Sequence, residues 1–440
     1  MVKTEYGLVE GFKRGGCTIY QGIPYAKPPI GRLAFKHPVK CDSWSGVLKA
    51  DHGSKNPIQP LEGFGVGNNG LDCLYLNIFV PDKKGDEKLP VMFWIFGGAY
   101  VQGAAGAVEE GSNILAYNLE RFAVESNTVV VSVNYRLGIY GFLNLNSLNS
   151  NFDINNGLHD QLMALQFVND NIEAFGGDSN NITVFGESAG AGSTLALMSM
   201  DKAKGLFHKA IVQSAPVDHV FTYRESAKYA RLFLKIAGIH KASDLLNMSQ
   251  KQLDYSFKMF SNILRAQTEI RCPFSPIIDG VDLVDEPKKL AVKSNISMLI
   301  GNTKNEGALF TRNMPTFVMP IVAPLLGLKL KPDADTFRQR VINALTRKVF
   351  IEPQMEILND YKGKVYKYVY QYVVKGSKLG SFHGSEVFIM FGAKETFDGL
   401  KIEKDDEIGA LMRRIWGKFA TTGNPGWEEY SPGANTFVIG

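Results

Sequence analysis

Residues 182–200 read ITVFGESAGAGSTLALMSM, and this stretch decides the fold that the sequence predicts. Four strand-forming residues, Ile182 to Phe185, lead into Gly186-Glu187-Ser188-Ala189-Gly190, and a good helix former follows up to Met200. A G-x-S-x-G pattern between a strand and a helix is typical of a sharp turn that exposes its serine, because only small residues fit at both glycines. With 44 glycines in the chain a match alone is weak, and an inert serine is the alternative. The flanking strand and helix favour Ser188 as a nucleophile.

Similar apolar runs and helix-length segments alternate along the whole chain. We expect strands at 76–80, 91–96, 128–134, 182–185, 210–213, 297–300 and 365–374, and helices at 158–175, 188–200, 335–347 and 407–420. Continuous apolar strands alternating with helices predict an α/β fold, in which helices flank a central, mostly parallel sheet.

Two stretches of the chain lack strand patterns, at about 224–274 and 310–364. We expect them to be helical insertions within a single domain, 1–440. They would form a reduced cap over the carboxyl ends of the strands, the edge where α/β sheets bind ligands.

Composition excludes several classes of protein. The chain has 440 residues, 45% hydrophobic and 21% charged, which is ordinary globular usage and excludes disordered, collagenous and coiled-coil proteins. A net charge of +4 over this length, without a basic cluster, argues against a nucleic-acid partner. Two uncharged runs, 89–108 and 313–328, are interrupted by prolines or glycines. We therefore expect neither run to form a membrane-spanning helix.

The cysteines and the N-terminal residues bear on the compartment. The four cysteines are far apart, with no CxxC pair and no histidine pair at metal spacing, so a structural metal is not expected. The first sixteen residues carry charges throughout and do not resemble a secretory signal. Free thiols in a reducing compartment, and hence a cytoplasmic protein, are the expectation.

A serine nucleophile needs backbone N–H groups that stabilise the negative charge developing on the attacked carbonyl. One donor is the residue after the nucleophile, Ala189. The others belong on a glycine-rich loop after an earlier strand, and Gly97-Gly98-Ala99-Tyr100 follows the strand expected at 91–96. We expect the N–H groups of Gly98, Ala99 and Ala189 to form this oxyanion hole.

The base and the acid follow the serine in the chain order of this architecture, serine, acid, histidine. Of the histidines after Ser188, only His383 lies beyond the strand expected at 365–374 and leaves room for an acid-bearing strand before it. For the acid, the loop at 301–307 offers Glu306 at the end of an expected strand. Asp279, in the turn at 276–280, is its rival.

Together these residues resemble the type-B carboxylesterase/cholinesterase family of α/β hydrolases, in particular its bacterial para-nitrobenzyl-esterase-like members. The resemblance covers nearly the whole chain and rests on YQGIPYA at 20–26, DCLYLN at 72–77, NYRLG at 134–138, FGGD at 175–178, GESAG at 186–190 and TGNP at 422–425. It implies the α/β-hydrolase fold and hydrolysis of small-molecule carboxylic esters through an acyl-enzyme, with neither metal nor cofactor. It leaves monomer and dimer open.

The resemblance also assigns roles to individual residues. It implies that Glu306 is the acid and His383 the base, that Ser214 supports the acid, and that Glu187 and Glu386 are carboxylates surrounding these groups. Arg136 and Asp160 match an internal ion pair that is structural.

This sequence departs from the family pattern at several positions. Leu71 and Ala34 replace the two members of one ion pair, so neither charge is left alone. The usual disulfide partner of Cys73 is missing near residues 56–59, which predicts a free thiol.

The substrate pocket departs as well. The same loop lacks the tryptophan on which cholinesterases stack a quaternary ammonium group, and Phe64 is the aromatic residue nearby. Ile270 and Cys272 stand where cholinesterases have acyl-pocket phenylalanines, which predicts a roomier acyl site.

Two other functions fit parts of the sequence. The apolar stretch 317–326 is compatible with the lid of a lipase acting on longer acyl chains. The family also contains non-catalytic interaction proteins, but those lose the nucleophile, and this chain keeps all three triad positions.

Overall fold

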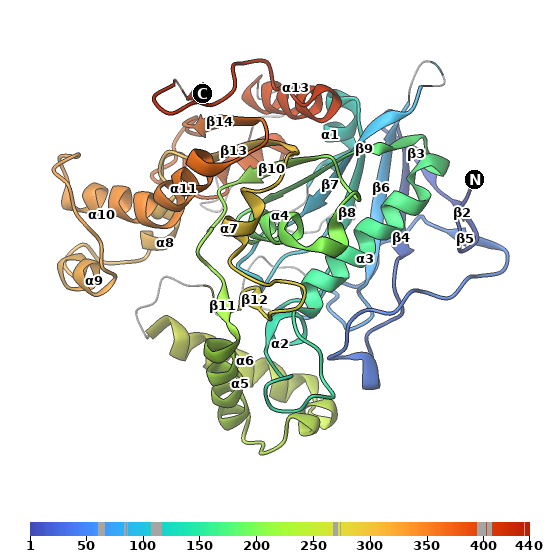
Figure 1. Ribbon diagram of the computed structural model, residues 1–440, viewed down its shortest axis with the longest axis horizontal. Coiled ribbons are helices and arrows are strands. Elements are labelled where there is room, and N and C mark those ends of the chain that lie inside the picture. The colour runs from blue at the N-terminus through green and yellow to red at the C-terminus, as the bar shows by residue number, and fades with distance from the viewer. Residues whose placement is uncertain are drawn as a thin grey trace.

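The computed structural model describes residues 1–440 with the exception of 60–66, 83–84, 86, 107–116, 267–271, 273, 394–401, 403–406 and 435. Its centre is one large, mixed sheet (Figure 1). Within the described residues this sheet has ten strands, in the order β15 (Phe437–Ile439), β14 (Val365–Tyr370), β13 (Ser297–Thr303), β10 (Lys209–Gln213), β9 (Gly177–Glu187), β7 (Leu89–Ile95), β8 (Val129–Val133), β6 (Tyr75–Pro81), β4 (Cys17–Pro24) and β3 (Phe12–Arg14).

The strands from β15 to β8 run parallel to their neighbours, and β6, β4 and β3 complete the sheet as antiparallel strands. The parallel strands are almost wholly buried; β8 reads VVVSV with every residue inaccessible to solvent. Such continuous apolar strands form because helices cover both faces of the sheet. Short pairings lie outside it, among β1 (Val2–Lys3), β2 (Leu8–Glu10) and β5 (Val47–Lys49), and between β11 (Phe221–Thr222) and β12 (Ile277–Ile278).

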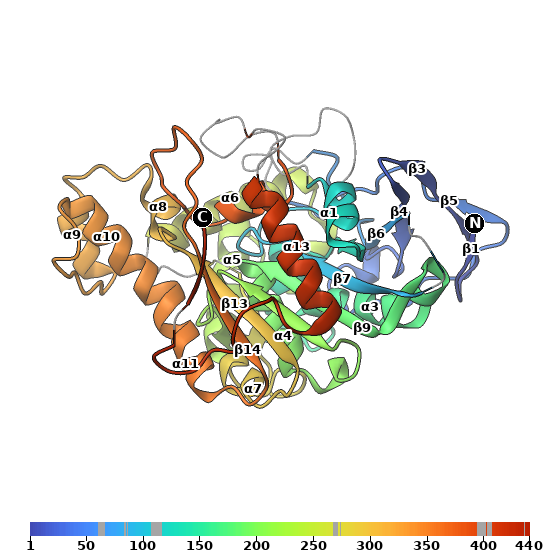
Figure 2. The same cartoon turned by 90° about the horizontal axis from the view of Figure 1, so that it is seen from above.

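Helices cover both faces. On one side α3 (Asn156–Asn171) and α4 (Ala189–Ser199) pack against the central strands, and on the other α1 (Leu119–Ser126) packs against α13 (Glu407–Thr422) (Figures 1 and 2). The contact between α1 and α13 is close, since a side chain at Gly417 would collide with the backbone of Ser126. Shorter helices are α2 (Gly138–Phe142), α7 (Pro287–Ala291) and α12 (Ser385–Met390).

The two stretches without strand patterns contain most of the remaining helices. Residues 224–274 contribute α6 (Gln250–Ala266) and all but the first residue of α5 (Tyr223–Ala237). Beyond β13 come α8 (Gly307–Thr311), α9 (Met319–Leu325), α10 (Phe337–Thr346) and α11 (Glu352–Asp360). In both views α9 and α10 project from one end of the molecule (Figures 1 and 2).

The fold class predicted from the sequence is confirmed, and each of the seven expected strands lies on a strand of the large sheet. The boundaries differ at the ends: the run expected at 365–374 stops pairing at Tyr370, and the helix expected at 158–175 closes with a 3₁₀ turn, Ile172–Phe175. Short strands such as β3 and β15 have too few residues for an apolar pattern and were not predicted.

Candidate active site

The register of the parallel strands brings the expected site residues to one edge of the sheet. Ile95 of β7 pairs with Gly186 of β9, and Glu187 of β9 pairs with Gln213 of β10. Gln213 in turn pairs with Gly301 of β13. Because the strands point the same way, the residues that follow them emerge together at their carboxyl ends.

Ser188 occupies the turn between β9 and α4 in a strained conformation, with φ 55° and ψ −122°. Only close packing holds a non-glycine residue there. A side chain at Gly190 would collide with the carbonyl oxygen of Ile95, and one at Gly186 would collide with the backbone of Gly190. The two glycines therefore let the turn approach β7, which is the steric reason for the G-x-S-x-G pattern.

A continuous chain of hydrogen bonds joins the serine to a buried carboxylate. Ser188 Oγ lies 2.8 Å from His383 Nε2, and His383 Nδ1 lies 2.5 Å from Glu306 Oε2. Since the ionised carboxylate only accepts, the imidazole donates from Nδ1, and in the neutral imidazole Nε2 can accept the serine proton. Ser188 follows β9, Glu306 follows β13, and His383 lies in the loop after β14. His383 is 195 positions from Ser188 and 77 positions from Glu306 in the chain.

Glu306 is fully buried and held by its other oxygen. Oε1 accepts hydrogen bonds from Ser214 Oγ at 2.6 Å and from the backbone N–H of Thr303 at 2.7 Å. Ser214 Oγ also lies 3.3 Å from Glu386 Oε1. This anchoring fixes the carboxylate so that it presents one oxygen to the imidazole.

Three buried carboxylates control the charge of the histidine. Burial alone lowers the pKa of His383, but Glu187 and Glu306 more than offset it and raise the pKa to about 9. Glu187 Oε1 is 3.3 Å from His383 Nε2, and burial raises the pKa of this carboxyl to about 7. Burial also raises the pKa of Glu386 well above its usual range, with Glu306 and Glu187 adding to the effect. The site therefore favours an imidazolium.

The loop after β7 runs directly against Ser188. A side chain at Gly97 would lie 3.1 Å from the Cβ of Ser188. Gly98, Ala99 and Tyr100 have φ values of 110°, 57° and 59°, a run of left-handed residues that turns the loop sharply.

The N–H groups of this loop are available to a substrate. Neither the Gly98 nor the Ala99 N–H donates a hydrogen bond to any residue that the structure describes. Ala189 is the first residue of α4, so its N–H has no acceptor within the helix. The loop thus places unused donors beside Ser188.

The rival acid lies elsewhere. Asp279 Oδ1 accepts hydrogen bonds from the N–H groups of residues 281–283, and its Oδ2 accepts one from Asn155. These contacts make Asp279 the organiser of its own turn. His208 is likewise engaged locally, with Nδ1 accepting from the N–H of Ile182.

The internal ion pair implied by the family resemblance is present. Arg136 and Asp160 form two parallel hydrogen bonds of 2.6 and 2.8 Å, and both side chains are buried. The same guanidinium donates to the carbonyl oxygens of Ala34 and Lys36. Cys73 is a buried free thiol, as predicted from its missing partner.

Of the expected pocket residues, Phe64 and Ile270 lie outside the described residues. Cys272 is partly exposed, with Sγ 3.3 Å from His219 Nδ1. Sequence reasoning missed Phe310 and Phe350, whose ring centroids lie 5.2 and 4.9 Å from that of His383.

Phe350 belongs to a π-helical turn, Arg347–Ile351, between α10 and α11. Such turns are frequent at functional sites because they re-aim side chains. No residue pattern in the sequence announces this turn.

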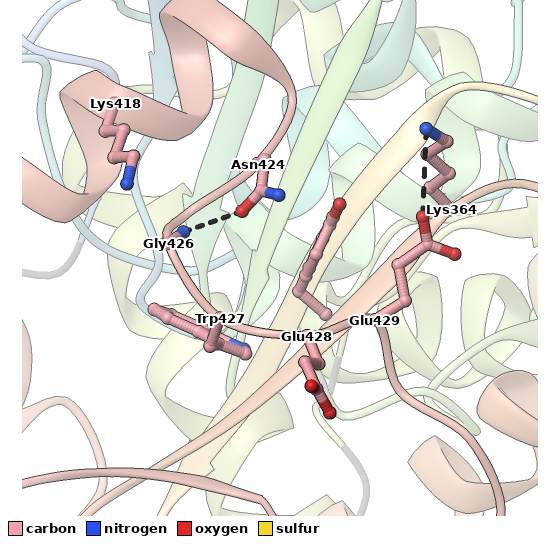
Figure 3. A pocket seen from close by; sticks show the side chains of 8 residues that line it. Lys364, Lys418, Asn424, Gly426, Trp427, Glu428 and Glu429 are labelled. Carbon is pink, nitrogen blue, oxygen red and sulfur yellow. Dashed lines mark hydrogen bonds and ion pairs between the residues drawn. The ribbon is translucent and has the colours of Figure 1, made fainter.

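A cavity of about 690 Å³ lies away from the triad (Figure 3). It is open to solvent and is lined by Lys364, just before the first residue of β14, and by Trp427 and Glu429 of the C-terminal segment. No triad residue lines it. Among the described residues, no group of three or more histidines, cysteines or acids could hold a metal ion, and no helix is long and apolar enough to cross a membrane.

Comparison with known proteins identifies the family of this chain. The profile of the carboxylesterase family matches residues 1–436. The chain belongs to this carboxylesterase family, and it is a carboxylic ester hydrolase. The chain is 36% identical to the para-nitrobenzyl esterase of Bacillus subtilis over 97% of its own length and 91% of the relative's.

A second relative and a solved structure are similar to this carboxylesterase over most of its length. The acetylcholinesterase of Bungarus fasciatus is 31% identical, covering 96% of this chain and 78% of the relative. A solved thermophilic PNB esterase superposes with a TM-score of 0.87 at 31% identity, covering all of this chain and 95% of the other. The family recognised from the sequence is thereby confirmed.

Proposed function

We propose that Ser188, His383 and Glu306 catalyse ester hydrolysis as a triad through an acyl-enzyme. The observation that carries this proposal is the unbroken chain of hydrogen bonds from Ser188 Oγ through the imidazole to Glu306. Each member also meets the environment that its role needs: a strained turn with a partly exposed serine for the nucleophile, an oriented imidazole for the base and a buried, anchored carboxylate for the acid.

The reaction runs in two halves. Ser188 Oγ attacks the ester carbonyl while His383 Nε2 takes its proton, and the tetrahedral oxyanion accepts hydrogen bonds from the oxyanion-hole N–H groups of Gly98, Ala99 and Ala189. The imidazolium then protonates the leaving alkoxide as the ester bond breaks. Water, deprotonated by the same imidazole, attacks the acyl-enzyme and releases the carboxylic acid and the free serine.

The surrounding carboxylates act on the imidazole. Glu306 and Glu187 stabilise the positive charge that His383 acquires in both halves, as the raised pKa of His383 indicates. Ser214 holds Glu306 in place from the other side, and Glu386 lies beside the Ser214 hydroxyl.

The test is Ser188→Ala. The smaller side chain fits the turn, so the fold remains, and turnover of p-nitrophenyl butyrate falls by about 10⁴-fold or more. An organophosphate labels Ser188 in the wild-type protein, located by peptide mass mapping. Labelling at another serine, with activity retained in the variant, contradicts the assignment.

Substrate preference and compartment extend this proposal. A p-nitrophenyl ester series from acetyl to palmitoyl, supplied below and above its solubility limit, separates a carboxylesterase from a lipase. We propose a cytoplasmic location on the ground that all four cysteines are free thiols. Two-disulfide protein recovered from an extracellular fraction would contradict it.

A further inference from the structure

Helix α9 carries an apolar face that points away from the protein. Residues 317–328 read FVMPIVAPLLGL and contain no polar side chain. The inner side of the helix is buried. Met319 and Ala323 pack there in a small apolar cluster with Val341, Leu345 and Phe350.

The outer side is exposed. Ile321 and Leu325, four residues apart on one face of α9, are 66% and 62% accessible to solvent. Phe317, in the turn just before the helix, is 80% accessible. A surface helix of a globular protein normally turns polar residues outward. The outward apolar face of α9 departs from this rule, and a second apolar environment would bury it.

The charge around this helix indicates what that environment is. Residues 310–350 contain seven lysines and arginines against two aspartates, a net charge of +5 compared with +4 for the whole chain. Asp333 is neutralised by its ion pair with Arg347.

Three lysines near the helix meet no carboxylate among the described residues. Lys329 and Lys331 are exposed just beyond its end and have no carboxylate partner among the described residues. Lys348 donates only to the carbonyl oxygens of Leu326 and Gly327, at the carboxyl end of the helix. An apolar face with unpaired lysines at its carboxyl end matches an anionic lipid surface, where the apolar groups enter the headgroup boundary and the lysines meet the phosphates.

The position of the face gives this contact a consequence for the enzyme. The cluster beneath α9 includes Phe350, whose ring contacts His383, and Phe310 stacks on Phe350 at 6.1 Å. In both views α9 and α10 stand out at one end of the molecule, so a flat surface can reach them (Figures 1 and 2). A membrane bound to α9 therefore lies on the same side of His383 as the rings of Phe310 and Phe350.

We propose that Phe317, Ile321 and Leu325, with the lysines beside them, dock this esterase on anionic lipid surfaces. The contact is peripheral, since the helix is only seven residues long. It does not depend on turnover, so its test is separate from that of the triad.

The experiment is sedimentation of the full-length protein with vesicles of phosphatidylglycerol and phosphatidylcholine, compared with phosphatidylcholine alone. We expect binding only to the anionic vesicles, weakened by raising the salt from 0.1 to 0.5 M. The variant Phe317→Ser/Ile321→Ser/Leu325→Ser should lose binding by about ten-fold for each residue. It should still hydrolyse p-nitrophenyl butyrate at the wild-type rate, which shows that it folds.

Two controls locate the effect. Lys329→Gln/Lys331→Gln should weaken binding by about five-fold per lysine, whereas Lys228→Gln/Lys235→Gln, which removes the same charge from exposed positions of α5, should not. Val281→Ser/Val284→Ser removes exposed apolar side chains from the turn before α7 and should also bind normally.

A direct readout does not rely on loss of binding. The emission of a Phe317→Trp variant should shift to the blue on anionic vesicles and be quenched by brominated lipid, and that of Val281→Trp should not. Wild-type protein that ignores both vesicles, equal losses in the control variants, or unchanged binding in the triple variant each overturn the proposal. So does a wild-type dimer that the triple variant converts to a monomer, because the face would then join two copies of this chain.

Discussion

Replacing Glu187 with glutamine tests how the carboxylates set the pH dependence of the enzyme. Glu187 Oε1 lies 3.3 Å from His383 Nε2 in a buried site. At an effective dielectric constant near 20, two opposite charges at this separation attract by about 5 kcal/mol, an upper limit for the effect. Pairs at such distances shift a pKa by about one to three pH units. Glutamine has the same shape, so the turn around Ser188 is preserved while the charge is removed.

The sign of the change follows from the role of the histidine. His383 accepts the serine proton only when it is neutral, so kcat/KM falls as the pH drops below its pKa, which is about 9 in the wild-type enzyme. Burial sets the pKa of Glu187 at about 7, so this carboxylate is ionised where the histidine loses its proton. We expect the acid limb of the Glu187→Gln profile to move down by about one to three pH units.

The rate at high pH should fall in the same variant. The imidazolium that forms as Ser188 attacks loses the neighbour that stabilised it, so the alkaline plateau of kcat/KM drops by at least about ten-fold. At low pH the lower pKa of His383 leaves more of the histidine neutral, and this offsets the lower plateau of kcat/KM. The two profiles should therefore converge at low pH and separate as the pH rises.

The assay is kcat/KM for p-nitrophenyl butyrate between pH 5 and 10, followed at the wavelength where nitrophenol and nitrophenolate absorb equally and corrected for spontaneous hydrolysis. Glu428→Gln, at an exposed position, is the control and should leave the profile unchanged. An acid limb that stays in place, or moves upward, in Glu187→Gln would refute the reasoning that this carboxylate holds the proton on His383.

Three further outcomes are expected. Glu306→Gln should lower kcat by about 10³- to 10⁴-fold with little change in Tm. Asp279→Asn, which weakens a turn, should lower Tm and leave kcat unchanged. The reverse result would mean that Asp279, and not Glu306, is the acid of the triad. A thiol reagent in denaturant without reductant should count four thiols, and a count of two or none would show disulfides. Choline esters should have a kcat/KM about ten-fold or more below neutral esters of equal acyl length, because residues 54–72 contain no tryptophan to stack on the cation; a choline ester that outperforms its neutral counterpart would reveal another cation site.

The candidate site was partly open to sequence reasoning because some of its constraints are local. The turn at Ser188 needs small neighbours whatever surrounds it, so the strand, the glycines and the helix indicate a candidate nucleophile within a dozen residues. His383 followed from chain order. Glu306 and Asp279 could not be separated by the same means, because both are carboxylates in loops after short apolar runs.

Tertiary contacts distinguish these two carboxylates. The carboxylate oxygens of Asp279 accept hydrogen bonds from N–H groups of its own turn and from Asn155. Glu306 instead bonds to His383, 77 positions later in the chain. Phe350 reaches the same histidine from a π-helical turn that no residue pattern predicts.

The sequence by itself determined seven strands of the sheet, the turn that carries Ser188 and the apolar character of residues 317–328, because strand propensity, turn sterics and hydropathy depend on neighbouring residues. It left open which way those apolar residues face. Packing decided that Met319 and Ala323 turn inward and that Phe317, Ile321 and Leu325 turn outward. A helix with apolar residues on all sides can bury any one of them, and only the position of α10 beneath it selects the buried face.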